Sequence, residues 1–168
     1  MSVTAHADNL EGKLGVPLEK VFERVLIAAE EKKFEKVKNA LKLLDPIAQE
    51  VNQELGINIK AQLEEAVNAG ERDQIIHRTQ QFVFFTIKIL LSGCHQYAAD
   101  RSHMAPLIRE AYALYLVLDY YVQKKDFLTA QDMKLAFRQA NMTVGVKAEE
   151  FKSVCSGIKG TLEHFFIP

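Results

Sequence analysis

The chain has 168 residues, of which 48% are hydrophobic and 26% charged, and this composition excludes a disordered protein. Its 21 basic and 22 acidic residues give a formal net charge of −1, which argues against nucleic-acid binding as the main activity, because phosphate neutralisation requires a basic excess. Its most apolar run, residues 82–91, is about half the length of a membrane-spanning helix and contains Lys88, so no membrane span is predicted.

Residues 1–15 form a polar leader, and a single helical-bundle domain is expected over residues 16–168. Within the leader, Ala5-His6-Ala7 before Asp8 has the small-x-small form of a signal-peptidase site, but the apolar segment that should precede it is missing. The sequence as written predicts a cytoplasmic protein. A periplasmic or otherwise exported protein is the alternative if this tripeptide is the remnant of a cleavage site.

Apolar residues recur at helical spacing, and there are only four prolines and eight glycines. The sequence therefore predicts an all-α fold, an antiparallel bundle of six or seven helices joined by short loops. Asp45-Pro46 is expected to kink the second helix or to begin a new one, and the spacing of Thr129 and Asp132 predicts a capping box. The predicted helices cover residues 17–32, 34–55, 58–70, 71–98, 102–124, a segment that starts near 130, and 147–165.

Residues 28–44 and 121–137 resemble each other weakly, at an offset of 93. In both segments a lysine-rich joint is followed by a phenylalanine and an amphipathic stretch. An ancient duplication of helical hairpins is one interpretation of this similarity. The other is that two amphipathic hairpins in one bundle look alike without common origin.

The segment 70–77 contains Arg72, Asp73 and His77 at the start of a predicted helix. This arrangement resembles the Arg-polar-x3-His signature of the HEPN family, all-α domains that include RNA-cleaving toxins and defence nucleases. The resemblance implies that Arg72 stabilises phosphate charge, that His77 acts as general acid/base or supports the attacking 2′-hydroxyl, and that two copies meet in a dimer. The alternative is a helix start, with the carboxylates of Glu71 and Asp73 near the positive end of the helix dipole.

The predicted helix over residues 71–98 also carries polar groups at regular spacing. His77, Gln81, Phe84, Lys88, Leu91 and His95 would share one face of that helix. This face is either the solvated side of a mostly buried helix, or it faces a pocket in which His77 or His95 ligates haem or a metal ion. No metal site is predicted from spacing, because the zinc-finger, zinc-protease and Glu-x-x-His patterns are missing from the sequence.

Two further features concern pairing in the second half of the chain. Asp119 has mostly apolar or aromatic neighbours in sequence, so if it is buried it needs a partner, and Lys88 is the expected one. Cys94 and Cys155 are far apart and are expected either to form one disulfide or to remain two buried free thiols.

These features favour a non-enzymatic helical binding module, because phosphate-binding loops and nucleophile elbows are missing from the sequence. Its ligand is expected to be a protein partner, with a homo-oligomer as one form, or else haem or a metal ion held between helices. The alternative function is a metal-independent ribonuclease of the HEPN kind at Arg72, Asp73 and His77.

Overall fold

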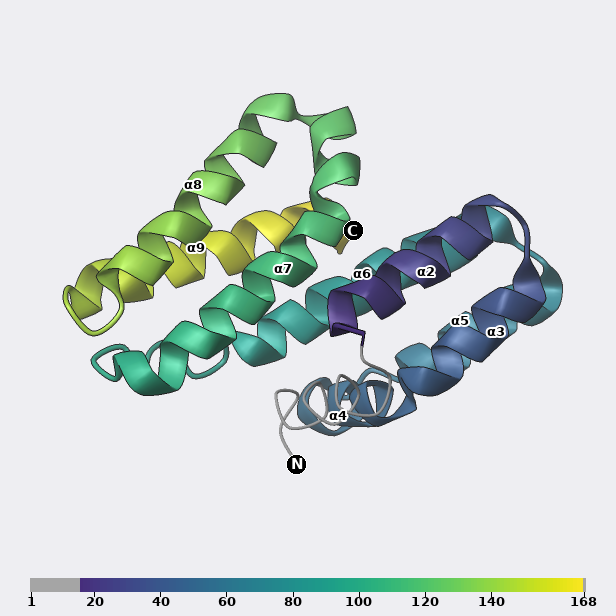
Figure 1. Ribbon diagram of the computed structural model, residues 1–168, viewed down its shortest axis with the longest axis horizontal. Helices are drawn as coiled ribbons and strands as arrows, with labels where there is room; N and C mark the ends of the chain where they lie inside the picture. Colours follow the sequence, from purple (N-terminus) through teal and green to yellow (C-terminus); the bar gives the residue numbers. More distant parts are fainter. Residues whose placement is uncertain (1–15, 168) are drawn as a thin grey trace. The chain divides into compact units, whose positions relative to one another are not determined.

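The computed structural model describes residues 16–167, which contain eight α-helices and no strand (Figure 1). The all-α prediction is confirmed, although the predicted leader and the tripeptide Ala5-His6-Ala7 lie outside the described residues. None of the described helices is both long enough and apolar enough to cross a membrane. The chain divides into two compact units between Thr86 and Ile87, within one helix. The expectation of a single domain stays a prediction.

The first unit begins with α2 (Leu18–Glu30) and α3 (Phe34–Leu43), which pack against each other. Helices α4 (Asp45–Leu55) and α5 (Ile59–Ala69) follow, and α5 contacts both α3 and α4. The first part of α6 (Arg72–Leu90) completes this unit. Its largest fully buried side chains are Phe22, Phe82, Phe84, Leu18, Leu44, Ile47, Ile59 and Leu63.

The helix boundaries of the first unit follow from local sequence signals. The predicted helix over 34–55 is two helices, because α3 ends at Leu43 and Pro46 lies in the first turn of α4, where its missing N–H costs nothing. The side chain of Asn58 caps α5 by accepting a hydrogen bond from the Ala61 amide at 3.2 Å. Gly56 and Gly70 end α4 and α5 in the left-handed conformation, with φ of 68° and 67°.

The second unit contains α7 (Arg101–Lys125), α8 (Phe127–Thr143) and α9 (Ala148–Phe166), and α8 packs against both α7 and α9. Figure 1 shows the sharp reversal that joins α7 to α8 and the course of α9 alongside α8. Phe137 of α8 lies between two rings of α7, with its centroid 5.4 Å from those of Tyr112 and Tyr115. The largest fully buried side chains here are Tyr115, Phe137, Phe151 and Phe166.

The helix predicted over residues 71–98 ends earlier than expected. Regular α-helix stops at Leu90, and residues 91–99 form a series of turns. Several bonds there span three residues rather than four: the Ser92 amide donates to the Ile89 carbonyl at 3.1 Å, and the Ser92 hydroxyl donates to the same carbonyl at 2.7 Å. Such local bonds compete with the helical ladder. Most of residues 82–91 are nevertheless buried.

The start of α8 also differs from the prediction. The capping residue is Asp126, not Thr129, and the helix begins at Phe127, three residues before Ala130. Asp126 accepts hydrogen bonds from the Thr129 amide at 3.0 Å and from the Thr129 hydroxyl at 2.8 Å. These bonds stabilise the carboxylate and lower the pKa of Asp126 below its ordinary value.

We expect the substitution Asp126→Ala to lower the midpoint of thermal unfolding by about 2–4 °C at pH 7, the usual consequence of losing a helix cap. Because the pKa of Asp126 is lowered in the folded state, this stabilisation is present above pH ~3.8 and is lost as the pH falls through the folded-state pKa. Circular dichroism melts at pH 7 and at pH ~2.5 check both statements. Asp132→Ala, in the predicted capping box, is the matched control, and an equal effect of both substitutions at pH 7 would contradict the assignment.

Candidate functional site

The structure places the three residues of the HEPN-like signature at the start of α6. Arg72 begins the helix, and its guanidinium donates hydrogen bonds to Glu30 of α2 and, at 2.7 Å, to Asp73. The bond to Glu30 raises the pKa of Arg72 above its ordinary value. His77 is half-buried and five residues further along α6, so the two side chains leave the helix about 140° apart. Arg72 is therefore engaged with carboxylates and does not share a helical face with His77.

The surface around Arg72 is rich in carboxylates. A shallow hollow there is lined by Glu30, Glu71 and Asp73, together with the cationic side chains of Lys32 and Arg72. Three carboxylates against two cations give the hollow a net negative charge. Such a charge balance disfavours a polyanionic substrate.

The predicted polar face of residues 77–95 is not a continuous solvated stripe. Its middle residues Gln81, Phe84 and Leu91 are buried. His95 lies beyond the end of α6, is exposed, and has its Nε2 3.3 Å from the Ser156 hydroxyl of α9. His77 belongs to the first unit and His95 to the second. Within residues 16–167, no group of three or more His, Cys, Asp or Glu side chains could hold a metal ion.

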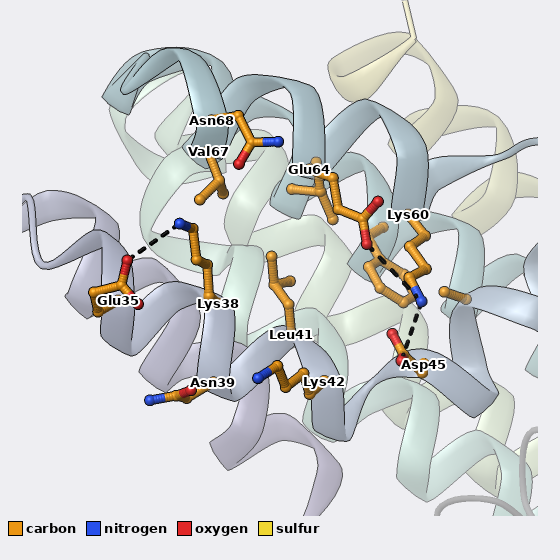
Figure 2. A pocket seen from close by; sticks show the side chains of 13 residues that line it. Glu35, Lys38, Asn39, Leu41, Lys42, Asp45, Lys60, Glu64, Val67 and Asn68 are labelled. Atoms are coloured by element: carbon orange, nitrogen blue, oxygen red, sulfur yellow. Dashed lines mark hydrogen bonds and ion pairs between the residues drawn. The ribbon is translucent and has the colours of Figure 1, made fainter.

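A groove of about 470 Å³ lies between α3 and α5 in the first unit (Figure 2). Its inner wall is apolar and includes the buried side chains of Leu63, Val67 and Phe82. Its rim carries charged groups that pair with one another, as Figure 2 shows: Lys38 with Glu35 at 3.1 Å, and Lys60 with Asp45 at 3.2 Å and with Glu64 at 3.9 Å.

The volume of this groove is typical of a small-molecule site, but the charged residues of its rim give no net charge. Three lysines and three carboxylates line it, and most of them form the ion pairs just described. The groove could not be predicted from the sequence, because its lining residues come from α3, α4, α5 and α6, and no local pattern encodes how these helices pack.

A buried polar network connects α7 to α8. Asp119 is only 8% exposed and accepts a hydrogen bond from the Tyr115 hydroxyl at 3.0 Å. Its ionic partner is Lys134 of α8, at 2.9 Å, and Gln123 donates a further hydrogen bond. The prediction that Lys88 is the partner of Asp119 was therefore wrong. Burial, together with the hydrogen bond to Asp119, raises the pKa of Tyr115 above its ordinary value. The buried carboxylate thus has the ionic and hydrogen-bond partners that its burial requires.

One face of α8 carries a stripe of exposed apolar side chains. We call Leu128, Leu135 and Met142 the α8 stripe; they are 73%, 58% and 74% exposed, respectively. They are spaced seven residues apart, so they drift by only about 20° per heptad around the helix and form a straight line. Exposed side chains flank this line on both sides, among them Asp132 and Arg138. The α8 stripe is thus a narrow apolar seam with charged edges.

Exposed apolar side chains are concentrated in the second unit. Of the eight large hydrophobic residues exposed in the described chain, only Ile27 belongs to the first unit. The other members are Leu116, Tyr120, Phe127, Leu128, Leu135, Met142 and Val146. These seven residues are distributed over α7, α8 and the segment that follows α8.

The α8 stripe was not predicted, although its heptad spacing is visible in the sequence. A second set on the same helix, which comprises Ala130, Met133, Phe137 and Ala140, also has helical spacing, and this set is buried. Periodicity alone does not reveal which of two apolar faces is covered. No family model, curated protein or solved structure matches the chain.

Proposed function

We propose that this chain is a non-enzymatic helical module that binds a protein partner through the α8 stripe. The observation that carries the proposal is the exposure of Leu128, Leu135 and Met142 in one line on a helix whose opposite side is packed. Large apolar side chains aligned at i, i+7 and i+14 are the anchors with which a helix binds another helix or a hydrophobic groove. Burying them against a partner removes their apolar surface from water.

The partner that fits this seam best is an amphipathic helix of a different protein. Three side chains offer on the order of 300 Å², well below the roughly 800 Å² per partner of a standard interface, so the contact is expected to be reversible. In an antiparallel pair of copies centred on Leu135, Asp132 would face Gln139 and Arg138 would face Gln131. Neither charge would then meet its opposite, which disfavours a symmetric homodimer.

Selection from a displayed library of heptad-patterned helical peptides against the full chain tests the proposal. Peptides enriched on the wild type are expected to lose more than tenfold in affinity for Leu135→Asp, because the substitution places a charge at the centre of the seam. Isothermal titration with the best peptide measures this change. Leu135 is 58% exposed, so the variant keeps the buried side of α8 intact.

The matched control is Ile27→Asp, the same kind of substitution at a residue that is 57% exposed in the first unit. Its affinity for the selected peptide is expected to equal that of the wild type. Two outcomes contradict the proposal: a library that yields no enriched peptide, and enriched peptides that bind Leu135→Asp as tightly as the wild type.

The other candidate functions have less support. A HEPN-like ribonuclease needs Arg72 for phosphate, but Arg72 is paired with Glu30 and Asp73. Within the described residues, neither His77 nor His95 belongs to a group of three or more His, Cys, Asp or Glu side chains that could hold a metal ion. For these reasons we assign neither activity to the chain.

The proposed hairpin duplication has one supporting observation. Phe34 and Phe127, which are equivalent at the offset of 93, are the first residues of α3 and α8, and they belong to different units. In this interpretation α2–α3 and α7–α8 are equivalent hairpins. The surroundings of the two phenylalanines differ: Phe34 is half-buried, whereas Phe127 is exposed.

A further inference from the structure

The two cysteines of the chain face each other inside the second unit. Cys94 lies in the turn segment 91–99 and Cys155 lies in α9, 61 residues later. Both side chains are fully buried, and their sulfur atoms are 2.6 Å apart. The residues that follow them are also in contact, through His95 and Ser156. The segment and the helix therefore meet at consecutive positions, with nothing between the two sulfur atoms.

We propose that Cys94 and Cys155 form a disulfide that ties the turn segment 91–99 to α9. The two thiols lose two protons and two electrons when their sulfur–sulfur bond forms. The co-reactant is a small-molecule or protein disulfide, such as oxidised glutathione, whose own bond is reduced to two thiols. The exchange passes through a mixed disulfide in which one of the two cysteines is first joined to the co-reactant.

Burial determines when this bond can form. The attacking species in thiol–disulfide exchange is the thiolate. The hydrogen bond with Cys94 and burial both raise the pKa of Cys155 well above its ordinary value, so this thiol stays protonated in the folded chain. Burial also blocks the approach of a co-reactant. Oxidation therefore occurs while the second unit folds or opens, and the completed disulfide is shielded from reductants in solution.

Refolding of the full chain from denaturant tests the proposal. One sample is refolded in a buffer of reduced and oxidised glutathione, and the other in excess dithiothreitol. In the glutathione buffer we expect a monomer whose mass is lower by two hydrogen atoms, with no thiol titratable after denaturation and with one peptide pair joined through Cys94 and Cys155. In dithiothreitol both thiols are expected to remain.

The variants Cys94→Ser and Cys155→Ser are the controls, and each should retain one cysteine that cannot form the internal bond. The proposal is overturned if the wild type refolded in glutathione keeps both thiols, or if it forms only mixed or intermolecular disulfides. These measurements are made on the wild type, so they hold even if a serine variant fails to fold. A folded, reduced chain that reacts with oxidised glutathione as fast as the unfolded chain would contradict the role given to burial.

Discussion

The substitution Asp119→Ala is expected to lower the free energy of unfolding by about 2–4 kcal/mol. It leaves the Tyr115 hydroxyl, which is buried, without its carboxylate acceptor, and it leaves Lys134, whose side chain is 25% exposed, without its ionic partner. The loss is larger than for a surface ion pair because Asp119 is almost completely removed from water. Urea denaturation of the full chain, followed by circular dichroism, measures the change.

A matched control for this prediction is Glu149→Ala. Glu149 also pairs with a lysine, Lys152, at 2.8 Å, but its side chain is 87% exposed. Little change in stability is expected for this variant, because water screens the pair. If Asp119→Ala and Glu149→Ala unfold at the same urea concentration, the network does not stabilise the contact between α7 and α8.

The substitution Phe22→Ala is expected to have an effect of similar or larger size, about 3–5 kcal/mol. Phe22 of α2 is completely buried, and its ring meets that of Phe82 edge to face, with centroids 5.0 Å apart and an interplanar angle of 84°. Alanine removes most of the apolar contact and leaves a cavity that a rigid helical core fills only in part. The same urea denaturation measures the loss.

Ile27→Ala provides the comparison on the same helix, because Ile27 is 57% exposed. A surface substitution of this kind is expected to change stability by less than about 0.5 kcal/mol. Phe22→Leu should fall between the two, since it retains part of the buried volume. If Phe22→Ala unfolds at the same urea concentration as the wild type, the placement of Phe22 in the core is contradicted.

Local signals in the sequence were sufficient to predict the helical class and most helix positions. The reason is that proline, glycine and asparagine act through their own backbone and side-chain geometry, as at Pro46, Gly70 and Asn58. The same signals failed at the start of α8, where the spacing of Thr129 and Asp132 predicted a capping box but Asp126 caps the helix. They also failed at the end of α6, where competing short-range hydrogen bonds end the helix at Leu90.

Contacts between helices could not be predicted in the same way. Asp119 was expected to need a partner, and it has one, but the lysine that reaches it is Lys134 rather than Lys88. Choosing between them requires the packing of α8 on α7, which one sequence does not specify. The same limit applies to the α8 stripe, since the sequence contains two apolar faces on α8 and only the fold shows which one is covered.

The most direct test of the central claim is to map where a selected helical peptide binds on the full chain. Backbone amide shifts in nuclear magnetic resonance spectra report this at each residue. Our account predicts that the largest changes occur on the exposed face of α8, around Leu128, Leu135 and Met142. Changes centred on Arg72 and His77, or on the groove between α3 and α5, would contradict it.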